Sequence, residues 1–235
     1  IWTERGSPLL FHTQDLTEGV RELLGPDVQV EFAMRYQNPS IASALEKFRA
    51  NGVDNIVVFP LFPQYSSAAT GSAVEKTWVE AGKLWNTPSL LNIPAFYDHP
   101  LFLEAFRQVA APVLDDMKPE RIVMSFHGIP ERHVRKSDET PNQTHSPASG
   151  TCCDAIVPAN RNCYRAQSFA TARALANALE LPDDTWEITF QSRLGRDPGI
   201  KPYTKCGRAT RVTTAGSVCR PPARVRASPS RAARS

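Results

Sequence analysis

Four short segments of the chain join polar, charged or aromatic side chains to proline or glycine where an apolar run ends. They are Arg35–Pro39, Pro60–Ser67, Ser125–Pro130 and Gln191–Pro198. In a sheet of parallel strands, ligands bind beyond the carboxyl ends of the strands, so the loops that follow the strands should hold the site. The sequence therefore predicts one site assembled from these four segments.

The side chains in these segments favour a flat, apolar ligand that carries acidic groups. The aromatic and cationic members are Tyr36, Phe62, Tyr65, Arg35, Arg193 and Arg196. A single histidine, His127, stands where the apolar run Arg121–Phe126 ends, and Gly128 beside it leaves space. A lone histidine in this setting can be a packed structural residue or a functional one, and its position alone leaves both readings open.

Three cysteines lie close together in the segment TCCDAIVPANRNC, at Cys152, Cys153 and Cys163. Three thiols in so short a span can share a metal or an iron–sulfur cluster, which usually takes four ligands. Upstream, only His145 could be the fourth, and it could equally occupy the loop without ligating. The alternative is three thiols with no metal role. The odd total of five cysteines argues against a disulfide framework.

Apolar runs alternate with helical spacing along the chain, which predicts a doubly wound α/β fold with a parallel sheet. The expected strands are Val28–Tyr36, Asn55–Phe62, Ser89–Phe96, Arg121–His127 and Trp186–Gln191. One helix should begin after Ser40, a suitable N-cap, and bury Ile41, Ala44, Leu45 and Phe48. A second should begin at Pro100 and bury Phe102, Ala105, Phe106, Val109 and Val113. A third should bury Phe169, Ala172, Ala176 and Leu179.

The positive charge of the chain is concentrated in residues 205–235. The whole chain carries +3 and this tail alone +8, which leaves −5 for residues 1–204. We therefore expect no nucleic-acid partner, and the tail to be a basic disordered extension or the product of a shifted reading frame. Residues 135–150 are polar and should form an exposed loop. No run approaches the roughly 20 apolar residues of a membrane span, so we expect a cytoplasmic protein with at most peripheral membrane association.

Three long segments resemble signature segments of bacterial ferrochelatases, nearly residue for residue and in the same order. They are PLFPQYSSAATGS, SFHGIPER and TFQSRLGRDPGIKPYT, within a similarity that runs from Trp2 to Thr204. The resemblance implies two Rossmann-like halves with a porphyrin cleft between them. We expect a first half at residues 1–127, a connection and incomplete second half at 128–204, and the tail at 205–235. The activity implied is that of a lyase that inserts Fe²⁺ into protoporphyrin IX to form protohaem in haem biosynthesis.

The resemblance also implies roles for individual residues. In the family, the histidine at the position of His127 faces the metal and the pyrrole nitrogens, either as a base or as an iron ligand. Porphyrin-binding residues by the same comparison are Arg35, Tyr36, Tyr65, Ser66 and Arg193. Some bacterial ferrochelatases carry an internal cysteine-rich segment that holds a 2Fe/2S cluster, which Cys152, Cys153 and Cys163 resemble.

The chain departs from the family pattern at three places. The family strand before IWTERGSP is missing, and Gly199 stands where the family has a tryptophan in DPWIKPYT. The family's acidic segment after KPYT is also missing, so we expect a chain truncated at both ends. These departures leave an alternative open, an inactive remnant that binds porphyrin without inserting metal.

Overall fold

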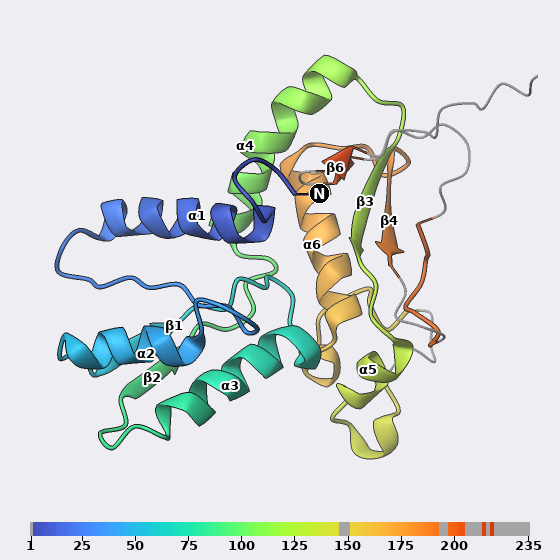
Figure 1. Cartoon of the computed structure of the whole chain (residues 1–235). Coiled ribbons are helices and arrows are strands. Elements are labelled where there is room, and N and C mark those ends of the chain that lie inside the picture. Colours follow the sequence, from blue (N-terminus) through green and yellow to red (C-terminus); the bar gives the residue numbers. More distant parts are fainter. Residues whose placement is uncertain (1, 146–150, 193–196, 205–212, 215–216, 219–235) are drawn as a thin grey trace, which may run out of the picture. The chain divides into compact units, whose positions relative to one another are not determined.

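The computed structural model describes the whole chain except residues 1, 146–150, 193–196, 205–212, 215–216 and 219–235 (Figure 1). The chain divides into two compact units, Ile1–Phe96 and Tyr97–Ser235, which are described separately below. Short parallel strand pairs combined with helices confirm the predicted α/β class. The domain boundaries expected from the family resemblance concern its two halves and stay a prediction.

The first unit contains three α-helices and one pair of parallel strands. The order is α1 (Pro8–Leu24), α2 (Ile41–Ala50), β1 (Asn55–Val58), the π-helix η1 (Ser67–Gly71), α3 (Ser72–Ala81) and β2 (Ser89–Asn92). The α2 prediction is confirmed, and the Ser40 hydroxyl caps the helix by accepting from the Ser43 amide at 3.1 Å. Both strands are shorter than expected. The buried centre of the unit consists of Leu45, Ile56 and Ala81.

The expected strand Val28–Tyr36 is wrong, because the structure places no strand between α1 and α2. A strand requires a neighbour that continues its hydrogen-bond ladder. The described hydrogen bonds of its main-chain groups form no ladder: the Met34 amide donates to the Pro39 carbonyl, and the Val30 carbonyl accepts from Arg21 Nε. The segment has the apolar composition of a strand but no ladder partner.

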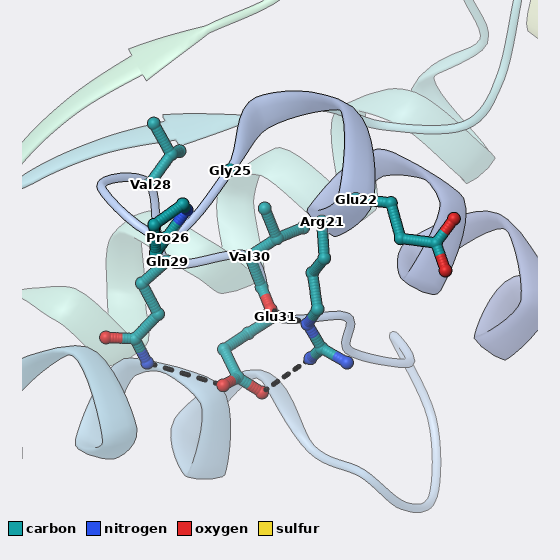
Figure 2. Close-up of a pocket in the computed structure, with 8 residues that line it drawn as sticks. All are labelled: Arg21, Glu22, Gly25, Pro26, Val28, Gln29, Val30 and Glu31. Carbon is teal, nitrogen blue, oxygen red and sulfur yellow. Dashed lines mark hydrogen bonds and ion pairs between the residues drawn. The ribbon is translucent and has the colours of Figure 1, made fainter.

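A hollow of about 560 Å³ lies beside this segment, at the end of α1 (Figure 2). The residues that form its walls are Arg21, Glu22, Gly25, Pro26, Val28, Gln29, Val30 and Glu31. Figure 2 shows Gln29 and Arg21 directed toward the Glu31 carboxylate, which also pairs with Lys47 at 2.7 Å. The Glu31 carboxylate is thus already paired with two cations, and none of the residues predicted to bind a ligand lines the hollow.

The second unit is a βαβ arrangement with a deeper core. Its order is α4 (Pro100–Met117), β3 (Ile122–His127), α5 (Glu131–Lys136), η2 (Pro141–Gln143), η3 (Pro158–Asn160), α6 (Tyr164–Ala178), β4 (Trp186–Gln191), β5 (Thr213–Thr214) and β6 (Ser217–Val218). Strands β3 and β4 are parallel and in register from Ile122 opposite Trp186 to His127 opposite Gln191. Helix α6 connects them and packs against β4 and α4 (Figure 1).

The apolar face of α4 differs from the expected one. The helix begins at Pro100 as predicted, but Val109 is 69% and Val113 42% exposed. The residues that pack against the core are Leu103, Phe106 and Leu114. The buried side of the helix is therefore rotated from the predicted stripe, although both follow helical spacing.

The polar segment after α5 is more ordered than a solvent-exposed loop. Asp138 is buried, and its carboxylate accepts hydrogen bonds from the Thr140 amide and hydroxyl and from the His145 amide. This network turns the chain back toward the cysteine segment. In the tail, the described part contains the antiparallel pair of β5 and β6.

Candidate functional site

His127 is the last residue of β3, and its side chain is exposed. Strand β3 is buried through Ile122, Val123 and Met124, so the rigid part of the strand ends just before the histidine. No described group forms a hydrogen bond with the imidazole. An exposed imidazole on a packed strand can accept a proton or bind a metal ion.

The loop after His127 is fastened to the segment that follows β4. The Gly128 amide donates to the Gln191 carbonyl at 2.5 Å, and the Ile200 amide donates to the Ile129 carbonyl at 3.0 Å. A Cβ atom at Gly128 would lie 2.8 Å from the Gln191 carbonyl oxygen, which real Cβ contacts essentially never show. Because glycine has no side chain, the backbone at Gly128 can approach the backbone at Gln191 closely.

Tyr164, the first residue of α6, holds His127 from the other side. Its hydroxyl donates to the main-chain carbonyl of His127 at 2.9 Å. Burial raises the pKa of Tyr164 further above neutral pH, where a tyrosine hydroxyl is already protonated and can donate. The position of His127 therefore depends on α6 as well as on β3 and β4.

In the first unit, Arg35 and Tyr36 form one part of the candidate ligand-binding set. Arg35 Nε donates to the Ser72 carbonyl at 3.0 Å and to the Ser72 hydroxyl at 2.8 Å. Its guanidinium carbon lies 4.7 Å from the centre of the Tyr36 ring, a cation–π contact. The Tyr36 side chain is 71% exposed. The loop after Met34 thus presents a cation and an aromatic face beside the start of α3.

Tyr65 and Ser66 reach the same end of α3. The Ser66 hydroxyl caps η1 by accepting from the Ala69 amide at 3.2 Å. A Cβ atom at Gly71 would lie 3.2 Å from the Tyr65 hydroxyl, which places Tyr65 against the residue before Ser72. The structure therefore brings Arg35, Tyr36, Tyr65 and Ser66 together within the first unit. His127 belongs to the second unit, and Arg193 and Arg196 lie outside the described residues.

The three cysteines form a buried row of thiols in the second unit. The Sγ atoms of Cys152 and Cys153 are 3.7 Å apart, and Cys153 also forms a hydrogen bond with Cys163. All three thiols are free. Cys206 and Cys219 lie outside the described residues. Within the described part, no group of three or more His, Cys, Asp or Glu side chains surrounds a point that could hold a single metal ion.

The thiols differ in their readiness to ionise. Burial raises the pKa of Cys152 to about 11. The hydrogen bond from Cys153 and the amide of Ala166, 3.5 Å away at the start of α6, lower the pKa of Cys163 to about 7. The hydrogen bond with Cys163 and burial raise the pKa of Cys153, although Arg165 donates a hydrogen bond to the Cys153 sulfur at 2.9 Å. Of the three thiols, Cys163 is therefore the one that ionises most readily.

Several residues that shape these sites were not predicted from the sequence. Ser72 orients Arg35, Tyr164 holds His127, and Arg165 contacts Cys153. A signal was available for Arg165 alone, because a cation close to cysteines in sequence lowers thiol pKa values. The contacts of Ser72 and Tyr164 each span 37 residues, and no local pattern indicates them.

Comparison with known proteins assigns the family. The ferrochelatase family model matches residues 1–211. A ferrochelatase of Legionella pneumophila strain Philadelphia 1 is 41% identical over 206 residues, which cover 87% of this chain and 59% of the relative. One of Coxiella burnetii strain Dugway is 38% identical over 87% of this chain and 56% of its own, and one of Opitutus terrae is 36% identical over 87% and 58%. The chain belongs to the ferrochelatase family.

The chain spans less than two thirds of the length of these relatives. The family match extends to residue 211, seven residues past the end of the similarity noted at Thr204. Among the described residues, no helix combines the length and apolar character needed to cross a bilayer.

Proposed function

We propose that this chain carries the ferrochelatase activity of its family, the insertion of Fe²⁺ into protoporphyrin IX to form protohaem. The observation that carries the proposal is His127, an exposed imidazole at the end of a buried strand, inside a segment shared with the family. Membership of the ferrochelatase family supports a chelatase of the lyase class that acts in haem biosynthesis.

His127 is proposed to act on the pyrrole nitrogens. In the reaction, Fe²⁺ replaces two pyrrole protons, two protons leave, and the oxidation state of iron does not change. The imidazole accepts a pyrrole proton or presents the iron, and both roles need its neutral form. Its backbone is tied to Tyr164 and, through Gly128, to Gln191, so the ring can approach a macrocycle from a fixed point.

The first-unit residues are proposed to bind the porphyrin. Arg35 Nε is occupied by Ser72, and no described group forms a hydrogen bond with its terminal nitrogens, which remain available to a carboxylate of the ligand. The exposed ring of Tyr36 offers a flat apolar face, and Tyr65 and Ser66 lie at the same end of α3. We also propose Arg193 as a porphyrin-binding residue on the family resemblance alone.

We further propose that Cys152, Cys153 and Cys163 hold a 2Fe/2S cluster. Their donor chemistry fits, because soft thiolates are the usual ligands of such clusters. The 3.7 Å separation of the first two sulfurs is close to the edge, about 3.8 Å, of a tetrahedron with metal–sulfur bonds of roughly 2.3 Å. Such a cluster would supply a redox-active group outside the metallation chemistry.

We place the protein in the cytoplasm, with at most peripheral membrane association.

The activity is tested by incubating the purified chain with Fe²⁺ or Zn²⁺ and protoporphyrin IX under anaerobic conditions. We expect metalloporphyrin to form, and His127→Ala to lower the rate at least about 100-fold, as the loss of an acid–base group does. His12→Ala, which removes an exposed histidine of α1, serves as the matched control and should leave the rate unchanged.

Two outcomes would overturn the proposal. Equal rates for His127→Ala and His12→Ala would remove His127 from the mechanism. Tight binding of porphyrin by the unmodified chain without any metallation would instead identify a porphyrin-binding protein.

A further inference from the structure

We infer that the hydroxyls of Ser125, Thr204 and Thr189 form a relay that carries protons away from His127. The inference rests on the metallation activity proposed above and deepens it, because it adds the route by which the released protons leave. His127 takes protons from the macrocycle, and the three hydroxyls return it to its neutral form.

The stoichiometry of the reaction creates the need for such a route. Insertion of one Fe²⁺ displaces two pyrrole protons, and only a neutral imidazole can accept a proton. After the first transfer, His127 is an imidazolium that must lose its proton before it can accept the second. A flat macrocycle bound against the exposed imidazole covers the side of the ring that is open to water. The proton therefore has to leave through the protein.

The relay lies on the same face of the β3–β4 pair as His127. Side chains alternate between the two faces of a strand, and residues paired in register share a face. The core face contains Ile122, Met124, Ile188 and Phe190. The opposite face carries Ser125 and His127 on β3, with Thr189 and Gln191 paired to them on β4. Ser125 is therefore the first side chain behind His127 on this face.

Thr204 joins the other two hydroxyls from the segment beside β4. Its amide donates to the Phe190 carbonyl at 3.0 Å, which holds the residue against the strand. Thr204 Oγ1 lies 3.1 Å from Ser125 Oγ and 2.7 Å from Thr189 Oγ1, and in both contacts either oxygen can be the donor. A hydroxyl can accept one proton while it releases its own, so three hydroxyls in contact can pass a proton in sequence.

The two ends of this chain of hydroxyls lead to His127 and to solvent. Ser125 and His127 are two residues apart on β3, roughly 6–7 Å along the strand, a span that one water molecule can bridge. On the same face of β4, Glu187 precedes Thr189 by two residues and is exposed. The continuation along β3 is closed, because the next side chain on this face, Val123, is apolar and buried. The route therefore crosses to β4 and ends at the Glu187 carboxylate.

The transfer leaves every group of the relay as it began. A pyrrole N–H bond breaks, its electron pair stays on the nitrogen that binds Fe²⁺, and an N–H bond forms on the His127 imidazole. The imidazolium then releases this proton through water to Ser125, and each hydroxyl in turn accepts one proton and releases one. Glu187 receives the proton and gives it to bulk water. His127 is neutral again for the second proton, and no electron changes hands.

The experiment measures metallation of protoporphyrin IX by the full chain with Zn²⁺ in steady state. Thr204→Val replaces the central hydroxyl by a methyl group and should lower kcat at least about tenfold, with KM unchanged. Thr204→Ser keeps a hydroxyl and should restore most of the rate. Ser125→Ala interrupts the same series of transfers, so its combination with Thr204→Val should be no slower than the slower single variant.

A chemical rescue distinguishes a relay from a packing role. A dimethylpyridine with a methyl group on each side of its nitrogen is a small base that binds metal poorly. Added to Thr204→Val, it should accept the proton and raise kcat in proportion to its concentration, and it should leave the unmodified chain unaffected. Thr17→Val is the matched control, because it removes a buried threonine hydroxyl that bonds to the Thr13 carbonyl within α1. Its kcat should equal that of the unmodified chain.

The outcomes separate the relay from the activity on which it rests. Equal kcat values for Thr204→Val and Thr17→Val would overturn the relay, and so would a lowered rate in Thr204→Val that the base does not raise. In both cases the difference between His127→Ala and the unmodified chain would leave the proposed activity standing. Absence of metallation by the unmodified chain would overturn the activity and the relay together.

Discussion

The two units bury their strand pairs to very different depths. In the second unit, β3 and β4 bury Ile122, Met124, Ile188 and Phe190 in the core cluster that also contains side chains of α4 and α6, and Val123 is buried as well. In the first unit, only Ile56 of β1 and β2 is buried, whereas Val57 is 59% and Leu91 64% exposed. The proposed reacting group and the proposed binding groups are therefore supported by parts of the molecule that are packed to different extents. His127 ends a packed strand, and Arg35, Tyr36 and Tyr65 stand on loops.

The largest expected effect comes from the core beneath His127. Phe190 is 1% exposed and lies between Phe126 and Phe169. Phe190→Ala should lower the free energy of unfolding of the second unit by about 3–5 kcal/mol. Phe59→Ala, in the first unit, removes a half-exposed ring and should cost about 1 kcal/mol through its contact with Phe96. Urea unfolding followed by hydrogen exchange measures the loss of unfolding free energy in each variant. Equal losses would contradict the difference in packing between the two units.

A second test probes the backbone contact beside His127. Gly128→Ala would set its Cβ 2.8 Å from the Gln191 carbonyl oxygen and should cost about 1–3 kcal/mol of unfolding free energy. Gly199→Ala is the matched control, because its Cβ would meet Tyr203 at an ordinary 3.5 Å and should cost less than about 0.5 kcal/mol. Thermal unfolding of both variants compares them, and similar melting temperatures would contradict the close approach at Gly128.

A third test sharpens the division between binding and reaction. Ser72→Ala removes one of the two acceptors of Arg35 Nε. The observed orientation of the Arg35 side chain should become less stable by about 1 kcal/mol. If Arg35 binds the porphyrin, KM should rise about fivefold while kcat stays unchanged. His127→Ala should instead lower kcat. Steady-state kinetics with protoporphyrin IX separate the two, and a fall in kcat for Ser72→Ala would argue against a binding role.

The smallest expected effect concerns the support of His127 by α6. Tyr164→Phe removes the hydrogen bond to the His127 carbonyl, which is worth roughly 0.5–1 kcal/mol. Amide exchange near His127 should accelerate and kcat should fall a few-fold. Tyr203→Phe removes a bond of similar length, 3.0 Å to the Gly199 carbonyl, and should leave exchange at His127 unchanged. Identical exchange in both variants would mean that Tyr164 does not position the histidine.

The sequence predicted the second unit better than the first, for a physical reason. Strands β3 and β4 each bury three consecutive residues, so their apolar runs carry the pattern of a covered parallel sheet. The run Val28–Tyr36 has the same composition but depends on a ladder partner, which a single-segment pattern does not reveal. The rotation of α4 has the same origin, because only the tertiary structure decides which side of an apolar helix is covered.

The sequence was enough to name the candidate site residues, whose roles stay predictions, but it did not indicate the contacts that hold them. His127 is singled out because it ends an apolar run and lies in a segment that resembles the family, and the cysteines because they are close in sequence. The roles of Ser72 and Tyr164 are not indicated by the sequence, because each acts through a contact with a segment 37 residues away that folding brings near.

The first turn of α6 serves two neighbours at once. Cys163 caps the helix, and Tyr164, the next residue, donates to the carbonyl of His127. A designer who transplants the end of β3 with its imidazole onto another scaffold must therefore carry this helical turn along with it. Grafting the strand alone would transfer the histidine without the hydrogen bond from Tyr164 that helps to hold its backbone.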